Sequence, residues 1–308
     1  MNFTPTELRI EVSTLCNARC NFCPHDTSFS RNKTTMTTEK YKIYLDKVLT
    51  GYPSITDVVF SGFGEVFLDS EVFEKMEYVN SKGLNIHILS NGSLIEESTS
   101  NKLFQLDNLK SIRISIHTSE AEKYDKIMNY KSNISFDDVL LNIRHLLDHK
   151  DENVDIILTA VVEDSNTLNL NDMIDKYSKD CYLEVWKPHN WVYGENYRSG
   201  DSIKKTCGRP FSGPIEVLVN GDVIMCCFDY NSKMILGNLN ESSILDIYSS
   251  EKYLEIVNHH SDGTCGSSNL ECNGCDQLLD KSDVLIYSNR DSNDRKNSTS
   301  TTLNLLDK

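Results

Sequence analysis

Three cysteines near the start of the chain have a spacing that suits a metal centre. They are Cys16, Cys20 and Cys23, separated by three and two residues. A four-iron cluster takes four ligands, so three thiolates would leave one iron open to bind a substrate or cofactor. Zinc is the alternative, with His25 as a fourth ligand. Because no secretion signal precedes them, disulfide pairing is the least favoured interpretation.

A second group of cysteines lies in the last third of the chain. Thirteen residues separate Cys207 from Gly221 and four more precede Cys226, while Cys272 and Cys275 form a Cys-x2-Cys pair downstream. A close pair of cysteines joined to two distant ones is typical of a metal site. The spacing alone fits structural zinc as well as an iron-sulfur cluster.

Three cysteines remain outside both groups. Cys181 precedes an apolar segment, and we expect it to be a buried thiol that packs as a small hydrophobic residue. Cys227 neighbours Cys226 and is either structural or a competing ligand. Cys265 lies between Gly263 and Gly266, whose backbone freedom would let the loop reach the active site. It is the candidate catalytic thiol, although a spare cluster ligand or an inert loop residue fits equally well.

Composition restricts the class of protein. The 308 residues are 39% hydrophobic and carry a net charge of −15, without a basic block, which disfavours nucleic-acid binding through phosphates. No apolar run is long enough to span a membrane, and the N-terminus lacks a basic start followed by a long apolar stretch. We therefore expect a cytoplasmic protein that binds neither membranes nor nucleic acids.

Strand-like and helix-like segments alternate through the first two hundred residues. The expected strands cover 8–12, 57–60, 85–89, 111–116, 154–162 and 182–186. The expected helices cover 38–49, 71–81, 95–106, 136–148 and 168–178. Such alternation predicts parallel strands joined by crossovers, and six units are too few for a full eight-fold barrel. The fold class is therefore α/β, with a partial (β/α)6 TIM-like barrel.

The pattern changes after about residue 200. Segments 215–219 and 223–225, joined through an Asn-Gly pair, predict a hairpin, and a helical stretch follows over 243–259. We assign residues 1–200 to the barrel, 201–285 to a small C-terminal α+β domain and 286–308 to a polar tail. The tail is rich in Ser, Asn, Asp and Thr, a composition typical of a solvated segment.

The three-cysteine loop, with aromatic Phe22 before its last cysteine, resembles the signature of the radical S-adenosylmethionine (SAM) enzymes. The loop Ser61–Glu65, after the second strand, resembles the family's Gly-Gly-Glu loop, which binds the methionine amino group. The resemblance implies that the cofactor contacts include Phe22, Gly64, Glu65, Ser90, Asn91, Ser115 and His117. Phe63 and Val66 depart from the family pattern, which has Gly and Pro at these positions.

The second cysteine group resembles the SPASM and twitch extensions of this family, which hold auxiliary four-iron clusters. No cysteine follows Cys275, so the shorter twitch type with one auxiliary cluster fits better. The resemblance therefore implies three cofactors: a SAM-binding 4Fe-4S cluster on the first cysteines, SAM itself, and a second auxiliary 4Fe-4S cluster held by Cys207, Cys226, Cys272 and Cys275.

The resemblance implies reductive cleavage of SAM and removal of a hydrogen atom from a substrate carbon by the 5′-deoxyadenosyl radical. An electron donor such as flavodoxin or ferredoxin would be needed. The arrangement of the cysteines and the length of the chain most resemble those of family members that oxidise or epimerise aminocyclitol or aminosugar carbinols. A small molecule is favoured over a peptide because Cys16 lies almost at the terminus.

Four outcomes stay open. The substrate radical could lose an electron and give a ketone, or a thiol such as Cys265 could return hydrogen to the opposite face and invert the carbon. A third alternative is peptide modification. In the fourth, both cysteine groups bind zinc and the chain is a binding module without turnover.

Overall fold

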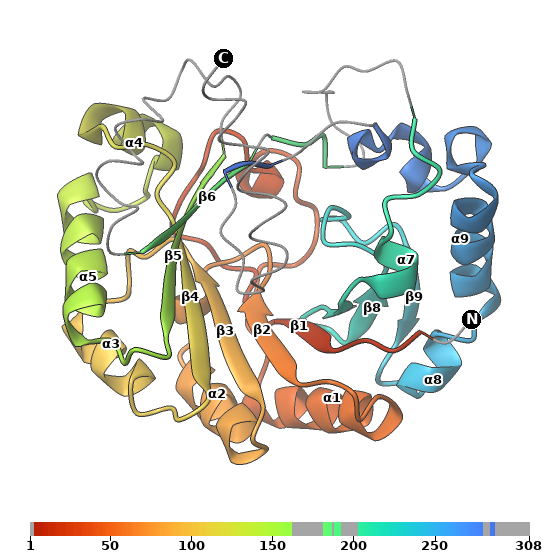
Figure 1. Cartoon of the computed structure of the whole chain (residues 1–308), viewed down its shortest axis with the longest axis horizontal. Helices are drawn as coiled ribbons and strands as arrows, with labels where there is room; N and C mark the ends of the chain where they lie inside the picture. The colour runs from red at the N-terminus through yellow and green to blue at the C-terminus, as the bar shows by residue number, and fades with distance from the viewer. Residues whose placement is uncertain (1–2, 162–180, 187, 192–202, 280–283, 287–308) are drawn as a thin grey trace.

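The computed structural model describes residues 3–161, 181–186, 188–191, 203–279 and 284–286. In these residues one ten-stranded sheet runs through the molecule in the order β10-β6-β5-β4-β3-β2-β1-β7-β8-β9. The helices of the N-terminal part lie along its outer side, and the C-terminal part extends the sheet beyond β1 (Figure 1). The predicted α/β partial barrel is thus confirmed.

Six parallel strands form the barrel. They are β1 (Glu7–Glu11), β2 (Asp57–Ser61), β3 (Asn85–Ser90), β4 (Leu109–Ser115), β5 (Asp155–Val161) and β6 (Tyr182–Trp186). The helices between them are α1 (Thr38–Gly51), α2 (Val72–Ser81), α3 (Glu97–Leu103), α4 (Ala121–Met128) and α5 (Phe136–His149). Helix α4 was not predicted from the sequence, and the helix predicted over 168–178 lies outside the described residues.

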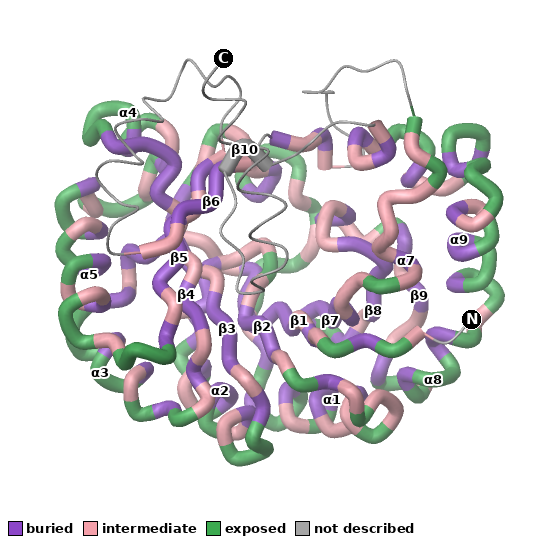
Figure 2. Tube along the Cα trace, viewed as in Figure 1, coloured by how far each residue is buried: buried purple, intermediate pink, exposed green. Residues whose placement is uncertain are grey.

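The two faces of the barrel sheet differ in polarity because side chains alternate along each strand. One face is apolar and packs on the helices, as the stacked rings of Phe60 and Tyr41 show at 5.6 Å. The opposite, concave face carries polar pairs, among them Arg113 of β4 with Glu184 of β6 at 3.4 Å. Figure 2 shows the strands largely buried between these two environments. A polar interior suits a site for a polar ligand.

The C-terminal part continues the barrel sheet. Its elements are α7 (Arg209–Ser212), β7 (Ile215–Val217), β8 (Asp222–Ile224), β9 (Ile235–Asn238), α8 (Ile244–Ile247) and α9 (Glu251–Asp262), followed by the short 3-10 helices η3 (Cys265–Ser267), η4 (Glu271–Gly274) and η5 (Asp276–Leu278). Strand β7 pairs in parallel with β1, and β7 and β8 form the predicted hairpin. The strand β10 (Val284–Ile286) returns to pair with β6, so the expected boundary at 285/286 falls inside it.

None of the helices in the described part of the chain combines the length and the apolar character that crossing a bilayer requires.

Candidate functional site

The loop with the first three cysteines follows β1, at the carboxyl end of the parallel strands. Two of its backbone N–H groups, those of Arg19 and Asn21, donate hydrogen bonds of 2.9 and 3.1 Å to the last carbonyls of α4. The Cys23 N–H donates to the Cys20 carbonyl at 3.0 Å. Helix α4 therefore fixes the conformation of the cysteine loop, although it contributes no cysteine of its own.

The environment of these thiols favours a bound cation. Burial, together with repulsion from Cys16, raises the pKa of Cys23 to about 11, although a backbone hydrogen bond at His25 opposes the shift. Burial and the two neighbouring thiols also raise the pKa of Cys20 above its usual range. Three half-buried thiols that resist ionisation become thiolates readily only when a metal centre neutralises them. The donor set therefore fits the cluster that the sequence predicted.

The ligands proposed for zinc do not form a closely spaced group in the described residues. Among the described residues, no three Cys, His, Asp or Glu side chains gather as closely as one metal ion requires. The proposed fourth ligand, His25, contacts the Thr14 carbonyl through Nε2 at 2.8 Å and stacks on Phe29. A four-iron cube needs more widely spaced thiolates than a single zinc ion does, because its sulfides separate the irons.

The loop after β2 packs directly on the cysteine loop. The Glu65 N–H donates to the Leu15 carbonyl at 2.7 Å. A Cβ atom on Gly64 would collide with the carbonyl oxygens of Ser13 and Leu15, so only glycine permits this approach. Gly64 thus brings the loop after β2 beside the segment that leads into Cys16, and contact between Gly64 and the cofactor stays a prediction.

The Glu65 carboxylate is buried and joins two strand ends. It accepts hydrogen bonds from the Ser90 hydroxyl at 2.7 Å, from the Asn91 N–H at 2.8 Å and from the Phe67 N–H at 3.3 Å. Burial raises its pKa, although these donors oppose the shift. The carboxylate therefore positions the loop after β3, and direct contact between Glu65 and the SAM ammonium stays a prediction.

We expect Glu65→Ala to weaken SAM binding while the cluster remains. The substitution removes three hydrogen bonds and leaves the buried Asn91 N–H without its acceptor, so the loop after β3 loses its fixed position. Equilibrium dialysis with SAM, together with iron analysis of the same samples, measures both effects. Glu97→Ala, at an exposed position on α3, is the matched control. An unchanged affinity for SAM would contradict the assignment.

Asn91 belongs to a closed set of polar contacts that includes the cysteine loop. Its Nδ2 donates to Asn17 Oδ1 at 2.8 Å, while Asn17 Nδ2 donates to the Ser93 hydroxyl at 2.9 Å. The Ser93 hydroxyl in turn donates to Asn91 Oδ1 at 2.6 Å. The sequence analysis missed Asn17 and Ser93, and the only available signal was that Asn17 directly follows Cys16.

The uncharged ring of His117 packs beside the cysteine loop. Its ring packs edge-on against Phe22 at 4.7 Å, and its Nδ1 accepts the Val161 N–H at 3.1 Å. Burial lowers the pKa of His117 to about 3, so the ring is neutral and its proton lies on Nε2. Its backbone adopts a left-handed conformation, with φ of 54°. Ser115 ends β4 two residues earlier, on the concave face.

The pKa of His117 predicts how stability changes with pH. Below its ordinary pKa of 6.5 the unfolded chain binds a proton that the folded chain takes up only near pH 3. Folding stability therefore falls as pH decreases from about 6.5, by about 1.4 kcal/mol per pH unit from this group. We expect His117→Asn, which tolerates the left-handed backbone, to lack this slope in urea unfolding between pH 5 and 7.5. The exposed His149→Asn should keep it, and equal slopes in wild type and His117→Asn would contradict the assignment.

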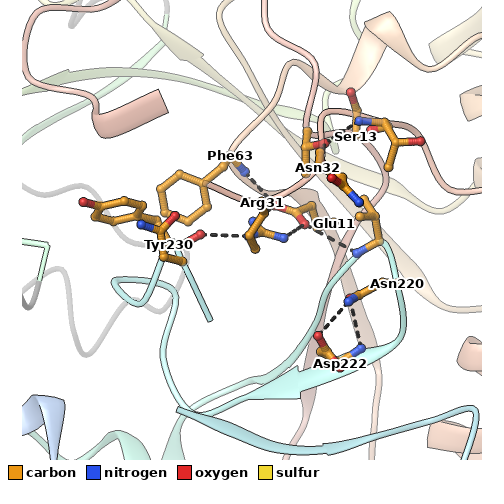
Figure 3. A network of polar contacts seen from close by, with 12 residues as sticks. Glu11, Ser13, Arg31, Asn32, Phe63, Asn220, Asp222 and Tyr230 are labelled. Atoms are coloured by element: carbon orange, nitrogen blue, oxygen red, sulfur yellow. Dashed lines mark hydrogen bonds and ion pairs between the residues drawn. The ribbon is translucent and has the colours of Figure 1, made fainter. Parts of the chain in front are cut away.

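A buried ion pair connects the cysteine loop, the barrel and the C-terminal part (Figure 3). Arg31 forms two hydrogen bonds of 2.7 Å to the Glu11 carboxylate, and its Nε donates to the Tyr230 carbonyl at 2.8 Å. The Glu11 carboxylate also accepts the N–H groups of Phe63, at 3.1 Å, and Val219, at 3.4 Å. One carboxylate at the end of β1 thus holds three segments that are distant in sequence.

The second predicted cysteine set comes together in one pocket. The pocket is lined by the four predicted ligands, together with His260, Arg209 and other residues. The four ligands are Cys207, Cys226, Cys272 and Cys275. Burial is the largest cause that raises the pKa of Cys275 to about 12, and it also raises that of Cys272. The buried Nε2 of His260 has no hydrogen-bond partner among the described residues. Four thiols beside an unpaired polar atom fit a bound cluster.

Cys265 does not lie in a flexible loop over the barrel mouth. Gly263 ends α9 in a left-handed conformation, with φ of 73°, and η3 begins two residues later. Cys265 is only 1% exposed, and its charge would act on Cys272. Gly263 therefore serves as a helix stop rather than as a hinge. The predicted catalytic thiol is placed beside the auxiliary cysteines.

The other two spare cysteines lie in different places. Cys181 directly precedes β6, and hence lies at the opposite end of the parallel strands from Cys16. Cys227 is not among the residues that line the auxiliary pocket, whereas its neighbour Cys226 is. The structure therefore favours Cys226 as the ligand and a structural role for Cys227.

Comparisons with known proteins agree with this geometry. Residues 10–164 match the model of the radical SAM superfamily, and residues 207–276 match that of an iron-sulfur cluster-binding domain, SPASM. The chain is 24% identical over 273 residues to S-adenosyl-L-methionine-dependent 2-deoxy-scyllo-inosamine dehydrogenase of Niallia circulans, covering 88% of this chain and 92% of the relative.

Solved structures show the same fold at low identity. BtrN in complex with AdoMet and 2-DOIA matches with a TM-score of 0.63 and 19% identity, covering 90% of this chain and 94% of that chain. Native anSMEcpe with bound AdoMet matches with a TM-score of 0.67 and 17% identity, over 90% and 92% of the two chains. Streptococcus suis SuiB bound to precursor peptide SuiA matches at 0.64 and 13% identity, over 89% and 70%.

The family match implies a 4Fe-4S cluster and SAM in the barrel, and the SPASM match implies auxiliary iron-sulfur binding in the C-terminal part. We propose that the three-cysteine loop and the four-cysteine pocket hold these clusters. The chain is therefore a radical SAM enzyme, a member of the radical SAM superfamily with a SPASM domain after its barrel.

Proposed function

We propose that this enzyme oxidises a carbinol of a small aminocyclitol- or aminosugar-like molecule to a ketone. The observation that carries the proposal is the similarity to the 2-deoxy-scyllo-inosamine dehydrogenase, which extends over both the barrel and the auxiliary domain. When bound, SAM and the clusters supply a 5′-deoxyadenosyl radical, which takes hydrogen from the carbinol carbon, and an acceptor for the remaining electron. The hydroxyl proton leaves to solvent or to a base.

The concave face of the barrel supports a polar substrate. Arg113 and Glu184 extend from β4 and β6 and contact each other at 3.4 to 3.5 Å. Thr159, on β5 between them in the sheet, presents a hydroxyl on the same face as Ser115. Charged and hydroxyl groups that converge on one face can bind the hydroxyl and amino groups of a cyclitol. The net charge of −15 favours a cationic amino compound.

The positions of the spare cysteines favour oxidation over epimerisation. An epimerase of this type needs a thiol that returns a hydrogen atom to the substrate carbon. Cys265 is buried beside the auxiliary cysteines and Cys181 lies at the far end of the barrel. Epimerisation through Cys265 is therefore the second candidate.

Product analysis tests the proposal. The reconstituted enzyme is incubated anaerobically with SAM, dithionite and 2-deoxy-scyllo-inosamine or related aminocyclitols, in deuterated water. We expect one ketone for each 5′-deoxyadenosine, formed equally well by wild type and by Cys265→Ala. An inverted alcohol with one deuterium at the carbinol carbon, lost in Cys265→Ala, would establish epimerisation instead. Cleavage of SAM without any change in these compounds would reject the aminocyclitol class.

A further inference from the structure

The auxiliary pocket contains a buried polar nitrogen, Nε2 of His260, that has no hydrogen-bond partner in the described part of the chain. His260 lies in the last turn of α9 and is 1% exposed. Its Nδ1 contacts the Thr206 hydroxyl at 2.8 Å, and that hydroxyl already accepts the Gly208 N–H at 2.9 Å. The Thr206 hydroxyl can donate its hydrogen to Nδ1, and in that tautomer the ring proton lies on Nε2. This N–H lines the pocket without a partner among the described residues.

A positively charged side chain, Arg209, lines the same pocket. The guanidinium of Arg209 lies over the ring of Phe228 at 4.8 Å and lines the pocket beside the cysteines. No ion pair among the described side chains involves Arg209, although its charge is attracted by the buried Glu216 and by the neighbouring cysteines. Met225 and Met234 provide apolar walls, so an electrostatic interaction there is less screened than in water. A charge in such a place requires a negative partner.

We propose that His260 and Arg209 set the reduction potential of the auxiliary cluster, His260 through an Nε2–H hydrogen bond to a cluster sulfur and Arg209 through its charge. A cluster with four thiolate ligands is anionic, and reduction adds one further negative charge. Donors and positive charge therefore stabilise the reduced form more than the oxidised form and raise the potential. The cluster then accepts an electron from the substrate more readily. The inference rests on the proposed ligand set but not on the identity of the substrate.

The test is a redox titration of the auxiliary cluster followed by electron paramagnetic resonance. The parent is the full chain with Cys16, Cys20 and Cys23 replaced by alanine, so that the auxiliary cluster gives the only signal. Two substitutions in this parent, His260→Leu and Arg209→Met, remove the proposed interactions. Two others, His260→Gln and Arg209→Lys, retain a hydrogen-bond donor or a positive charge. Arg144→Met and His149→Leu on α5, on the far side of the barrel, are matched controls (Figure 1).

We expect His260→Leu and Arg209→Met each to lower the reduced-to-oxidised ratio at a fixed potential about tenfold, which is about 59 mV for a one-electron couple. The conservative variants should recover most of the shift, and the controls should not move. Unchanged midpoints with intact clusters would overturn the inference alone. Loss of iron in both His260→Leu and Arg209→Met would also overturn the inference. The two residues would then be needed for the cluster to assemble, rather than for its reduction potential. A parent without a cluster would reject the ligand set and the inference together.

Discussion

Replacing Cys16, Cys20 and Cys23 together by alanine should reduce SAM cleavage to the level of a reaction without enzyme. The three thiols are the ligands that the first loop offers, and helix α4 fixes that loop through two backbone hydrogen bonds. Without the ligands there is no open iron to bind and reduce SAM, so no other residue can compensate. Anaerobic assays of 5′-deoxyadenosine formation with dithionite measure the effect.

Variants of the auxiliary set should behave differently. Replacing the four auxiliary cysteines by alanine should leave uncoupled SAM cleavage while product formation stops, because those cysteines line a separate pocket. Cys181→Ala, at the opposite end of the barrel, should retain both activities. If the auxiliary variant lost cleavage and the first variant kept it, the roles of the two sets would be reversed.

Glu11→Ala should destabilise the protein by about 3–5 kcal/mol, because it leaves one partner of a buried ion pair uncompensated. The side chains of Arg31 and Glu11 are only 13% and 3% exposed. The same substitution removes the acceptor of two backbone N–H groups, those of Phe63 and Val219. Urea unfolding of the reconstituted protein under anaerobic conditions measures the change in free energy.

The matched control for Glu11 is an ion pair on the surface. Glu120 and Lys123 are 48% and 49% exposed, so Glu120→Ala should cost at most about 1 kcal/mol. Arg31→Met should cost less than Glu11→Ala, since the carboxylate keeps its two backbone donors. Equal effects of Glu11→Ala and Glu120→Ala would show that the network in Figure 3 does not hold the three segments together.

The strands and cysteine sets could be predicted from the sequence because each has a local signal. Buried parallel strands appear in a sequence as short runs of β-branched residues, and the spacing of cysteines can be read without knowing the fold. Helix α4 was missed because it has eight residues and buries only Tyr124 and Met128, which is too little periodicity for a pattern search. The helix matters because its last backbone carbonyls accept hydrogen bonds from the cysteine loop. Every residue type has a backbone carbonyl, so the sequence gives no sign of this role.

Long-range polar contacts could not be predicted for a related reason. Glu11 and Arg31 meet only after the cysteine loop folds back on β1, and Asn17 finds Asn91 only across two strand ends. The loop that holds Cys265 posed a different difficulty, because a glycine after a helix with two histidines in its last turn indicates a left-handed helix stop as well as a flexible loop. Adjacent sequence gave no basis for choosing between the two.

Counting iron in each cysteine variant tests the central claim, that each of the two cysteine sets holds one four-iron cluster. After anaerobic reconstitution, wild type should bind about eight irons with matching sulfide, and each set variant should bind about four. The two remaining clusters should give different electron paramagnetic resonance spectra, and only the cluster of the first set should change its spectrum when SAM is added. Stoichiometric zinc without iron, or a wild type that binds only about four irons, would contradict the account.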